Sequence, residues 1–277
     1  MSAVEAASTI EGLLRESGLP RQEAEILLRG VLGCDRVHLI AHPGEPLDPS
    51  KARTGQAWFA RRRSGEPVSY IVGRREFYGL DLQVTADVLI PRSETELLVD
   101  LALERLPVGQ PARVLDLGTG SGAIALVLAS ERPGLEIVAA DVSEAALAVA
   151  RRNAREHGFD VDFVRSDWLE SLGPDPFDVI VSNPPYVAES DPHLERGDLP
   201  FEPRIALVGG RDGLACIREI AAGARDRLRP GACLLVEHGY DQGERCVELL
   251  RDLGYAGVTD FPDLAGLPRV CAATRPG

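Results

Sequence analysis

The chain has 277 residues, of which 44% are hydrophobic and 26% are charged, close to the average of a soluble globular protein. This composition excludes a disordered tail, a collagen-like fibre and a small disulfide-rich protein, and its apolar runs are too short to span a membrane. The 43 acidic residues outnumber the 30 basic ones, giving a net charge of −13. The chain therefore lacks the general positive field that is typical of nucleic-acid-binding proteins.

The cysteines and histidines do not predict a metal or disulfide site. The five cysteines are dispersed and form no CxxC pair, which indicates reduced thiols in the cytoplasm. The five histidines lack metal-ligand spacing, so we expect no metal. Glu5, Glu11 and Glu16 lie among the first apolar residues, which is not typical of a signal peptide. We expect a cytoplasmic monomer that does not contact a membrane.

The N-terminal segment, residues 1–66, predicts a small helical bundle. Apolar residues recur at helical spacing in two stripes, the first starting at Ala7. A third helix, capped by Asp48 or Ser50, is expected to run to about Arg63. We found no chemical motif in this segment.

A linker is expected at residues 67–91, where the apolar pattern changes. Val68, Tyr70 and Val72 alternate with other residues, and further apolar residues follow among glycines. This pattern predicts a β-hairpin or two short strands between two domains.

The remainder, residues 92–277, alternates predicted strands and helices. Helices are expected at 123–130, 144–156, 213–228 and 242–253. The expected strands are 114–116, 137–140, 161–164, 177–181, 233–236, 258–261 and 269–273. Such alternation predicts an α/β fold, with a doubly wound, mainly parallel seven-stranded sheet and helices on both faces.

A glycine loop between the first strand and its helix predicts a cofactor site. Glycines there let a ligand approach the backbone, and the helix N-terminus favours a negative group. Asp141 ends the second strand, where a carboxylate can accept from both ribose hydroxyls of an adenosine. Asp167 and Trp168 end the third strand, where they would flank an adenine ring. The candidate loop residues are Gly118, Thr119, Gly120, Ser121 and Gly122. The pattern does not identify the cofactor, because a dinucleotide also fits it.

Asn183-Pro184-Pro185-Tyr186 follows the fourth strand and predicts a cradle for a planar amino group. Two prolines make the bend rigid, so that main-chain carbonyls, together with the Asn183 side-chain carbonyl, are held as acceptors. Tyr186 offers a flat aromatic face. When two such acceptors take hydrogen bonds from both N–H groups of an amide, the lone pair of its nitrogen becomes free to attack an electrophile. This effect needs only positioning and electrostatics.

Together, the glycine loop and Asn-Pro-Pro-Tyr resemble those of a class I S-adenosylmethionine methyltransferase that acts on nitrogen, a group with a Rossmann-like fold. Several flanking motifs narrow this resemblance to the PrmC/HemK family of release-factor glutamine methyltransferases. These motifs are 66–73, Glu76-Phe77-Tyr78-Gly79, 89–96, Phe201-Glu202-Pro203-Arg204, 206–214 and Glu237-His238-Gly239. One small departure is Ser93, where many members have proline.

The resemblance implies methylation of the side-chain amide nitrogen (N5) of the glutamine in the Gly-Gly-Gln motif of class I peptide-chain release factors. S-adenosyl-L-methionine would be the cofactor and S-adenosyl-L-homocysteine the product. Gly118–Gly122 would hold the methionine end of the cofactor, Asp141 its ribose, and Asp167 and Trp168 its adenine. Asn183–Tyr186 would hold the glutamine amide, and the N-terminal bundle would contact the release factor. No direct contact with nucleic acid is implied.

Two other functions fit part of the pattern. A nucleic-acid adenine-N6 methyltransferase would use the same cradle, but it would need base flipping and a basic groove. The basic runs before the catalytic domain are Arg61–Arg63 and Arg74-Arg75. A cofactor-binding module without catalysis is a third reading, against which the Asn183–Tyr186 cradle argues.

Overall fold

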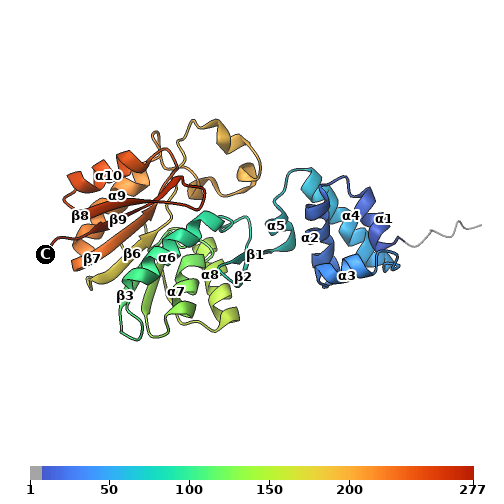
Figure 1. Ribbon diagram of the computed structural model, residues 1–277, viewed down its shortest axis with the longest axis horizontal. Coiled ribbons are helices and arrows are strands. Elements are labelled where there is room, and N and C mark those ends of the chain that lie inside the picture. The colour runs from blue at the N-terminus through green and yellow to red at the C-terminus, as the bar shows by residue number, and fades with distance from the viewer. Residues whose placement is uncertain (1–7) are drawn as a thin grey trace, which may run out of the picture. The chain divides into compact units, whose positions relative to one another are not determined.

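The structure, a computed structural model, describes residues 8–277 (Figure 1). The chain divides into two compact units, of which the first ends at Arg74 and the second runs from Arg75 to Gly277. Ala7, where the first predicted helical stripe starts, and Glu5 lie outside the described residues.

The first unit is helical, as its apolar stripes predict. Its helices are α1 (Ile10–Glu16), α2 (Arg21–Leu32), α3 (Arg36–Ala41), α4 (Pro49–Arg63) and α5 (Val68–Val72). Of the two candidate caps, Asp48 caps α4, because its side chain accepts from the main-chain N–H of Ser50. Leu13, Leu27 and Phe59 are buried in a core that these helices share. The short helix α3 was not predicted.

Helix α5 corrects the strand that we expected at Val68, Tyr70 and Val72. Gly73 adopts a left-handed conformation, with φ of 78°, and its N–H bonds the Ser69 carbonyl, so it ends the helix. Val68 and Val72 pack against the helical core, in which Ile71 is buried. The apolar spacing fits both a strand and one helical turn, and contact with the core selects the helix.

The predicted hairpin follows as a two-stranded sheet of β1 (Arg74–Phe77) and β2 (Leu80–Gln83). Its turn residues Tyr78 and Gly79 both have positive φ, 50° and 80°, the backbone that tight hairpin turns need. The Tyr78 hydroxyl donates to Asp100 at 2.7 Å. Phe77 and Leu82 are buried in a core of the second unit, which fixes the hairpin to that unit.

The second unit contains the predicted seven-stranded sheet, with strand order β5-β4-β3-β6-β7-β9-β8. Its strands are β3 (Arg113–Leu117), β4 (Glu136–Asp141), β5 (Asp162–Arg165), β6 (Phe177–Ser182), β7 (Leu228–Glu237), β8 (Ala256–Pro262) and β9 (Pro268–Thr274). The first five are parallel, and β9 pairs antiparallel with β7 and β8. The helices are α6 (Glu96–Arg105), α7 (Ala123–Glu131), α8 (Glu144–His157), α9 (Ala215–Arg227) and α10 (Gly243–Asp252). The predicted α/β class, with a mainly parallel doubly wound sheet, is confirmed.

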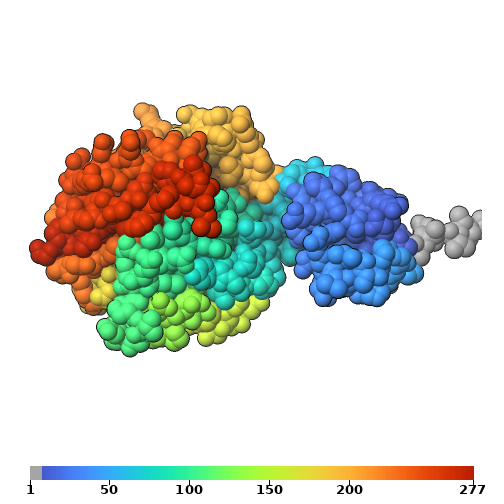
Figure 2. Space-filling view, in the orientation of Figure 1, coloured from blue at the N-terminus to red at the C-terminus, as the bar shows by residue number. Residues whose placement is uncertain are grey.

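Alternate residues of each central strand enter two cores, one on each face of the sheet. Val179 and Val181 of β6 face a core shared with α6 and α7, whereas Ile180 faces a core shared with α9 and α10. The segments around α6 and β8–β9 lie side by side in Figure 2, although they are far apart in the sequence. There the Arg105 guanidinium lies 5.7 Å from the centre of the Phe261 ring.

None of the helices in residues 8–277 has the length and apolar character needed to cross a lipid bilayer.

Candidate active site

A cavity of about 600 Å³ opens beside the carboxyl ends of the parallel strands. Strands β4 and β5 extend the sheet on one side of β3, and β6 and β7 extend it on the other, so the strand order reverses at β3 and β6. Ligands bind to open α/β sheets at this place, and the volume suits a small molecule. The predicted residues that line the cavity are Gly118, Thr119, Gly120, Ser121, Asp141, Asp167, Trp168, Asn183 and Pro185.

The glycine loop is held by hydrogen bonds to its neighbours. Thr119 donates through its hydroxyl to the buried carboxyl of Asp116 at 2.6 Å. The Ser121 carbonyl accepts from Asn153, whose side chain also bonds Gln83 of the hairpin. Gly122, which does not line the cavity, has φ of 84° immediately before α7. The loop is therefore a preformed turn whose shape depends on three neighbouring elements, which are β3, α8 and strand β2 of the hairpin.

Asp141 connects the glycine loop to the end of β4. Its Oδ2 accepts from the main-chain N–H of Gly120 and its Oδ1 from that of Ser143, both at 2.9 Å. Each carboxylate oxygen has a second lone pair for a ligand hydroxyl. Burial raises the pKa of Asp141, and these main-chain hydrogen bonds counteract that rise.

Asp116 is a second acid beside the loop, and the sequence alone does not predict a role for it. It is fully buried, its Oδ2 accepts from Thr119 and from the main-chain N–H of Ala125, and its Oδ1 has no partner among the described residues. Burial raises the pKa of Asp116 to about 7. Its contacts make it an anchor for the loop and for the start of α7.

Trp168 lies against the glycine loop and lines the cavity. A Cβ added to Gly118 would lie 3.5 Å from the Trp168 ring, and φ at Gly118 is 72°. Trp168 itself has a positive φ of 41°, which is uncommon for a bulky residue. The contact with the indole is an ordinary one, so the left-handed backbone at Gly118 is the physical reason for glycine at this position.

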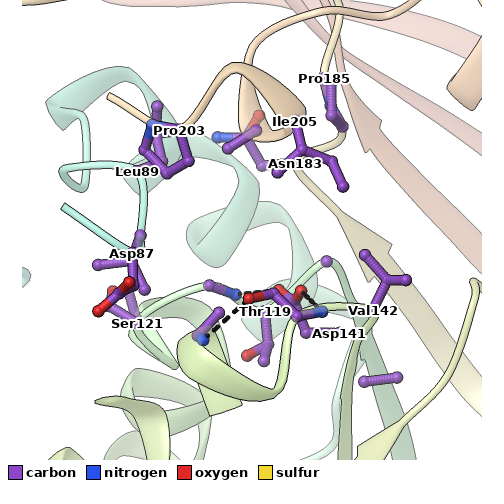
Figure 3. Close-up of a pocket in the computed structure, with 18 of the residues that line it drawn as sticks. Asp87, Leu89, Thr119, Ser121, Asp141, Val142, Asn183, Pro185, Pro203 and Ile205 are labelled. Carbon is purple, nitrogen blue, oxygen red and sulfur yellow. Dashed lines mark hydrogen bonds between the residues drawn. The ribbon is translucent and has the colours of Figure 1, made fainter. Parts of the chain in front are cut away.

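Asn183 and Pro185 line the cavity, whereas Pro184 and Tyr186 do not. Figure 3 shows Asn183, Pro185 and Ile205 across the cavity from Thr119 and Asp141. The Asn183 side chain donates through Nδ2 to the Thr95 hydroxyl at 3.0 Å, which leaves its Oδ1 as an acceptor. Within residues 8–277, no group donates a hydrogen bond to the main-chain carbonyls of Asn183 or Pro184. Among the described residues, these acceptors of the predicted cradle thus have no protein donor, and Asn183 is the one of the two residues that lines the cavity.

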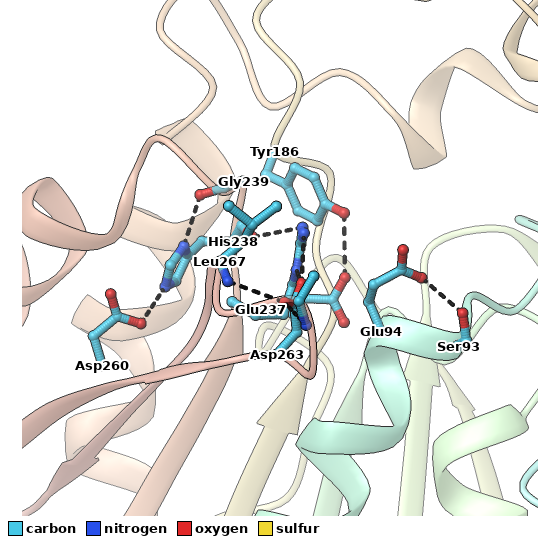
Figure 4. A network of polar contacts seen from close by, with 11 residues as sticks. Ser93, Glu94, Tyr186, Glu237, His238, Gly239, Asp260, Asp263 and Leu267 are labelled. Carbon is cyan, nitrogen blue, oxygen red and sulfur yellow. Dashed lines mark hydrogen bonds and ion pairs between the residues drawn. The ribbon is translucent and has the colours of Figure 1, made fainter.

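The Tyr186 hydroxyl donates to Oε1 of Glu237 at 3.2 Å (Figure 4). Glu237 ends β7, is fully buried and has no hydrogen-bond partner for Oε2 among the described residues. Burial raises its pKa to about 7, while the Thr95 hydroxyl, Arg269 and Tyr186 favour its charged form. Burial and the Glu237 charge in turn raise the pKa of Tyr186. Tyr186 is thereby held as a neutral hydrogen-bond donor.

Two glycines and a glutamine hold the backbone of the Pro-Pro-Tyr bend. A Cβ at Gly209 would collide with the Pro185 carbonyl oxygen, and one at Gly213 would collide with that of Tyr186. Gln242 donates to the Tyr186 carbonyl at 2.9 Å. This packing accounts for Gly209 and Gly213, two of the three glycines in the segment that resembles the family at residues 206–214.

Glu202 joins the two segments that form one wall of the cavity. Its side chain is fully buried and accepts from the Arg92 guanidinium at 2.5 Å and from the main-chain N–H of Ile90 at 3.4 Å. Leu89 and Pro91 line the cavity from one segment, and Pro203 to Ala206 line it from the other. Burial raises the pKa of Glu202, and Arg92 opposes that rise.

The site also contains three residues whose roles the sequence does not predict, although they lie in motifs that resemble the family. These residues are Thr95, Glu202 and Glu237. One signal was available for Glu237. It follows an apolar strand directly, as Asn183 does, and Ser182 pairs with Val236 in the sheet. Carboxyl ends of paired parallel strands lie side by side, so the two polar residues become neighbours.

The basic run Arg61–Arg63 is occupied by contacts within the first unit. Arg61 pairs with Glu66 at 2.5 Å and Arg62 with Glu23 at 2.7 Å, while Arg63 donates to the Ser17 carbonyl. These contacts do not favour a basic groove for nucleic acid.

Two groups of possible metal ligands come together in the described residues, but neither lines the cavity. They are His38, His42 and Glu45, and His238, Asp260 and Cys271. In the second group, Nδ1 of His238 faces the Gly239 carbonyl at 2.9 Å and Nε2 faces Asp260 at 3.1 Å. Both ring nitrogens are thus already occupied by protein acceptors.

Comparison with known proteins identifies the family. Residues 5–73 match the model of the PrmC N-terminal domain, and residues 94–196 match that of the methyltransferase small domain. The release factor glutamine methyltransferase of Burkholderia pseudomallei is 49% identical over 98% of this chain and 97% of its own length. That of Xylella fastidiosa is 48% identical over 94% of each chain, and that of Escherichia coli 45% identical over 93% of each.

The chain belongs to the release factor glutamine methyltransferase family. It is therefore an S-adenosylmethionine-dependent methyltransferase, and the resemblance noted in the sequence is confirmed over nearly the full chain.

Solved structures of lower identity share the fold of this methyltransferase. A methyltransferase from Pyrococcus furiosus superimposes with a TM-score of 0.56 at 21% identity, covering 79% of this chain and 98% of that one. The Thermus thermophilus 16S rRNA N2 G1207 methyltransferase, solved with AdoMet and guanosine, gives 0.52 at 22% identity, over 73% of this chain and 49% of that one. The predicted Rossmann-like class I fold is confirmed.

Proposed function

We propose that this methyltransferase transfers a methyl group from S-adenosyl-L-methionine to the side-chain amide nitrogen of the glutamine in the Gly-Gly-Gln motif of class I release factors. The names of its relatives support a release factor as substrate. The observation that carries the assignment to these residues is the Asn183 carbonyl acceptor, which lines the same cavity as Asp141.

The cofactor fits the residues on the β3–β5 side of the cavity. The bend at Gly118–Gly122 would receive the methionine end, and the free lone pairs of Asp141 would accept from the ribose hydroxyls. Asp167 and Trp168, which line the same cavity, would flank the adenine. When bound, the cofactor supplies an electrophilic methyl group on a sulfonium.

Asn183–Tyr186 would hold the glutamine amide. Oδ1 of Asn183 and the main-chain carbonyl of Pro184 would each accept a hydrogen bond from one N–H of the amide, which weakens the conjugation of the nitrogen with its carbonyl and directs the lone pair at the methyl group. As the new N–C bond formed, the bond between the methyl carbon and sulfur would break, S-adenosylhomocysteine would leave as a neutral thioether, and the methylated nitrogen would release one proton to solvent. The rate enhancement then comes from orientation and from oriented acceptors. Glu237 holds Tyr186 through its hydroxyl, and the aromatic face of Tyr186 would lie against the planar amide and restrict its orientation.

The N-terminal unit, for which we take residues 1–66 with the hairpin region 67–91 as linker, would bind the body of the release factor. Val37 and Ile40 of α3 are 70% and 62% exposed, an apolar pair suited to a protein partner. We further propose a monomer that acts in the cytoplasm, without metal and without direct contact to nucleic acid.

A labelling experiment tests this function. The chain is incubated with methyl-labelled S-adenosylmethionine and either a recombinant release factor, the same factor with its Gly-Gly-Gln glutamine replaced by alanine, or DNA. We expect label only on the unmodified factor. Label on the alanine variant or on DNA would contradict the proposal.

A further inference from the structure

Thr95 is a buried hydroxyl residue to which the proposed function gives no role. It lies in the 3-10 turn Ser93–Thr95 before α6, is 4% exposed, and contributes to the lining of the cavity. Its Oγ1 accepts from Nδ2 of Asn183 at 3.0 Å across 88 residues of sequence. A polar contact from another element to the end of β6 therefore acts on the residue that would hold the substrate.

Asn183 turns the NH2 end of its amide toward Thr95, because its Nδ2 lies 3.0 Å from the Thr95 hydroxyl oxygen, which accepts the hydrogen bond. The Thr95 oxygen thus holds the NH2 group of Asn183, and not its carbonyl.

This direction matters because an asparagine amide has two ends of opposite character. With Nδ2 on Thr95, Oδ1 faces the cavity and is an acceptor for the substrate NH2 group. After a rotation of the amide by half a turn, an NH2 group would face the NH2 group of the substrate, and two donors would oppose each other.

We propose that Thr95 is a positioning residue for methyl transfer, fixing the Asn183 amide so that its Oδ1 faces the cavity. This role rests on the proposed function, because it presupposes that Asn183 holds the glutamine. At the other end of Asn-Pro-Pro-Tyr, Glu237 accepts through Oε1 from the Tyr186 hydroxyl.

Single-turnover kinetics on an intact release factor test the role of Thr95. Thr95→Val keeps the shape and removes the hydroxyl, and we expect it to slow methyl transfer about 10- to 100-fold, as misplacement of a reacting group does. The affinity for S-adenosylmethionine and the thermal midpoint should stay close to those of the unmodified chain. Thr95→Ser, which restores the hydroxyl, should recover most of the rate. Thr259→Val, at an exposed threonine on β8, is the matched control and should have no effect.

A double-mutant cycle separates positioning from general stabilisation. If Thr95 acts only through Asn183, Thr95→Val should cause no further loss of rate in an Asn183→Ala background. An equal loss in both backgrounds, or a Thr95→Ser rate as low as that of Thr95→Val, would overturn the proposal. Should Thr95→Val fold poorly, Thr95→Ala serves in the same cycle.

The labelling experiment keeps this inference distinct from the proposed function. If the unmodified chain does not label the glutamine, the function itself is wrong and the role of Thr95 fails with it. If the unmodified chain labels the glutamine and Thr95→Val does so at the same rate, only the role of Thr95 is wrong.

Discussion

Asp141 at the end of β4 accepts a hydrogen bond from the main-chain N–H of Gly120 at 2.9 Å. The acid and the glycine loop, which the sequence presents as separate motifs, are therefore parts of one structure. A change at Asp141 alters the loop as well as any direct contact with a ribose.

The cofactor affinity should depend on Asp141. Asp141→Ala removes an acceptor for the ribose and the hydrogen bonds to Gly120 and Ser143. We expect binding of S-adenosylmethionine to weaken by about 1.5–3 kcal/mol, the range for a hydrogen bond to a charged group. Calorimetry measures this loss of affinity. Asp141→Asn keeps one acceptor, so its affinity for S-adenosylmethionine should lie between those of the unmodified chain and Asp141→Ala. An unchanged affinity in Asp141→Ala would show that the ribose assignment is wrong.

Turnover should depend on Asn183 much more than cofactor binding does. Asn183→Ala removes an acceptor of the transition state, and loss of one oriented polar group in an active site lowers turnover about 10²–10³-fold. The affinity for S-adenosylmethionine should change little, because most predicted cofactor contacts lie at Gly118–Gly122 and Asp141. Near-normal turnover of Asn183→Ala on a release factor would refute the cradle.

Asn183→Asp tests the electrostatics of the same position. The carboxylate keeps the shape of the side chain but places a negative charge beside the sulfonium. This charge stabilises the cationic ground state more than the transition state, in which the positive charge is dispersed. Turnover should fall while cofactor affinity holds or rises, as measured by single-turnover kinetics and calorimetry. A rise in turnover would contradict this explanation.

Release factor binding should depend on the apolar pair of α3. Replacing both Val37 and Ile40 by serine removes exposed apolar surface without cutting the core of the bundle. We expect KM for an intact release factor to rise about 5- to 30-fold, which corresponds to about 1–2 kcal/mol at an interface residue. Val108→Ser, at a valine 79% exposed in the second unit, is the control. An unchanged KM in the double variant would argue against recognition by this face.

Stability should respond to pH through Asp116. Its pKa is raised to about 7, so over the range from its ordinary value to about 7 the folded chain holds a proton that the unfolded chain releases. The contribution of Asp116 to the free energy of unfolding therefore falls as pH rises through this range. Asp116→Asn cannot ionise and should lose that part of the pH dependence.

Urea unfolding at about pH 5 and about pH 8 measures this effect. Relative to the unmodified chain, Asp116→Asn should be more stable at the higher pH than at the lower, by an amount of order a few kcal/mol. Asp175→Asn, at an exposed carboxylate, serves as the control for the loss of a charge. Equal pH dependence in Asp116→Asn and the unmodified chain would show that Asp116 does not titrate in this range.

The seven-stranded sheet could be predicted from the sequence alone, and most of the predicted site residues line the cavity. Strand and helix periods are local, and parallel strands connected by helices place their carboxyl ends at one edge. For this reason the sequence alone assigns Gly118, Asp141 and Asn183 to one site. The same local reasoning failed at Val68–Val72, where the apolar spacing fitted two conformations and the core of the first unit decided between them.

Only the tertiary structure decided how that site is supported. Thr95 reaches Asn183 across 88 residues, and Glu237 reaches Tyr186 across 51. The periodicity of the sequence does not predict such contacts. They depend on which helix covers which strand end and on the register of β6 with β7. The sequence determines which groups the chain brings to the cavity, and the packed fold decides which of their atoms face it.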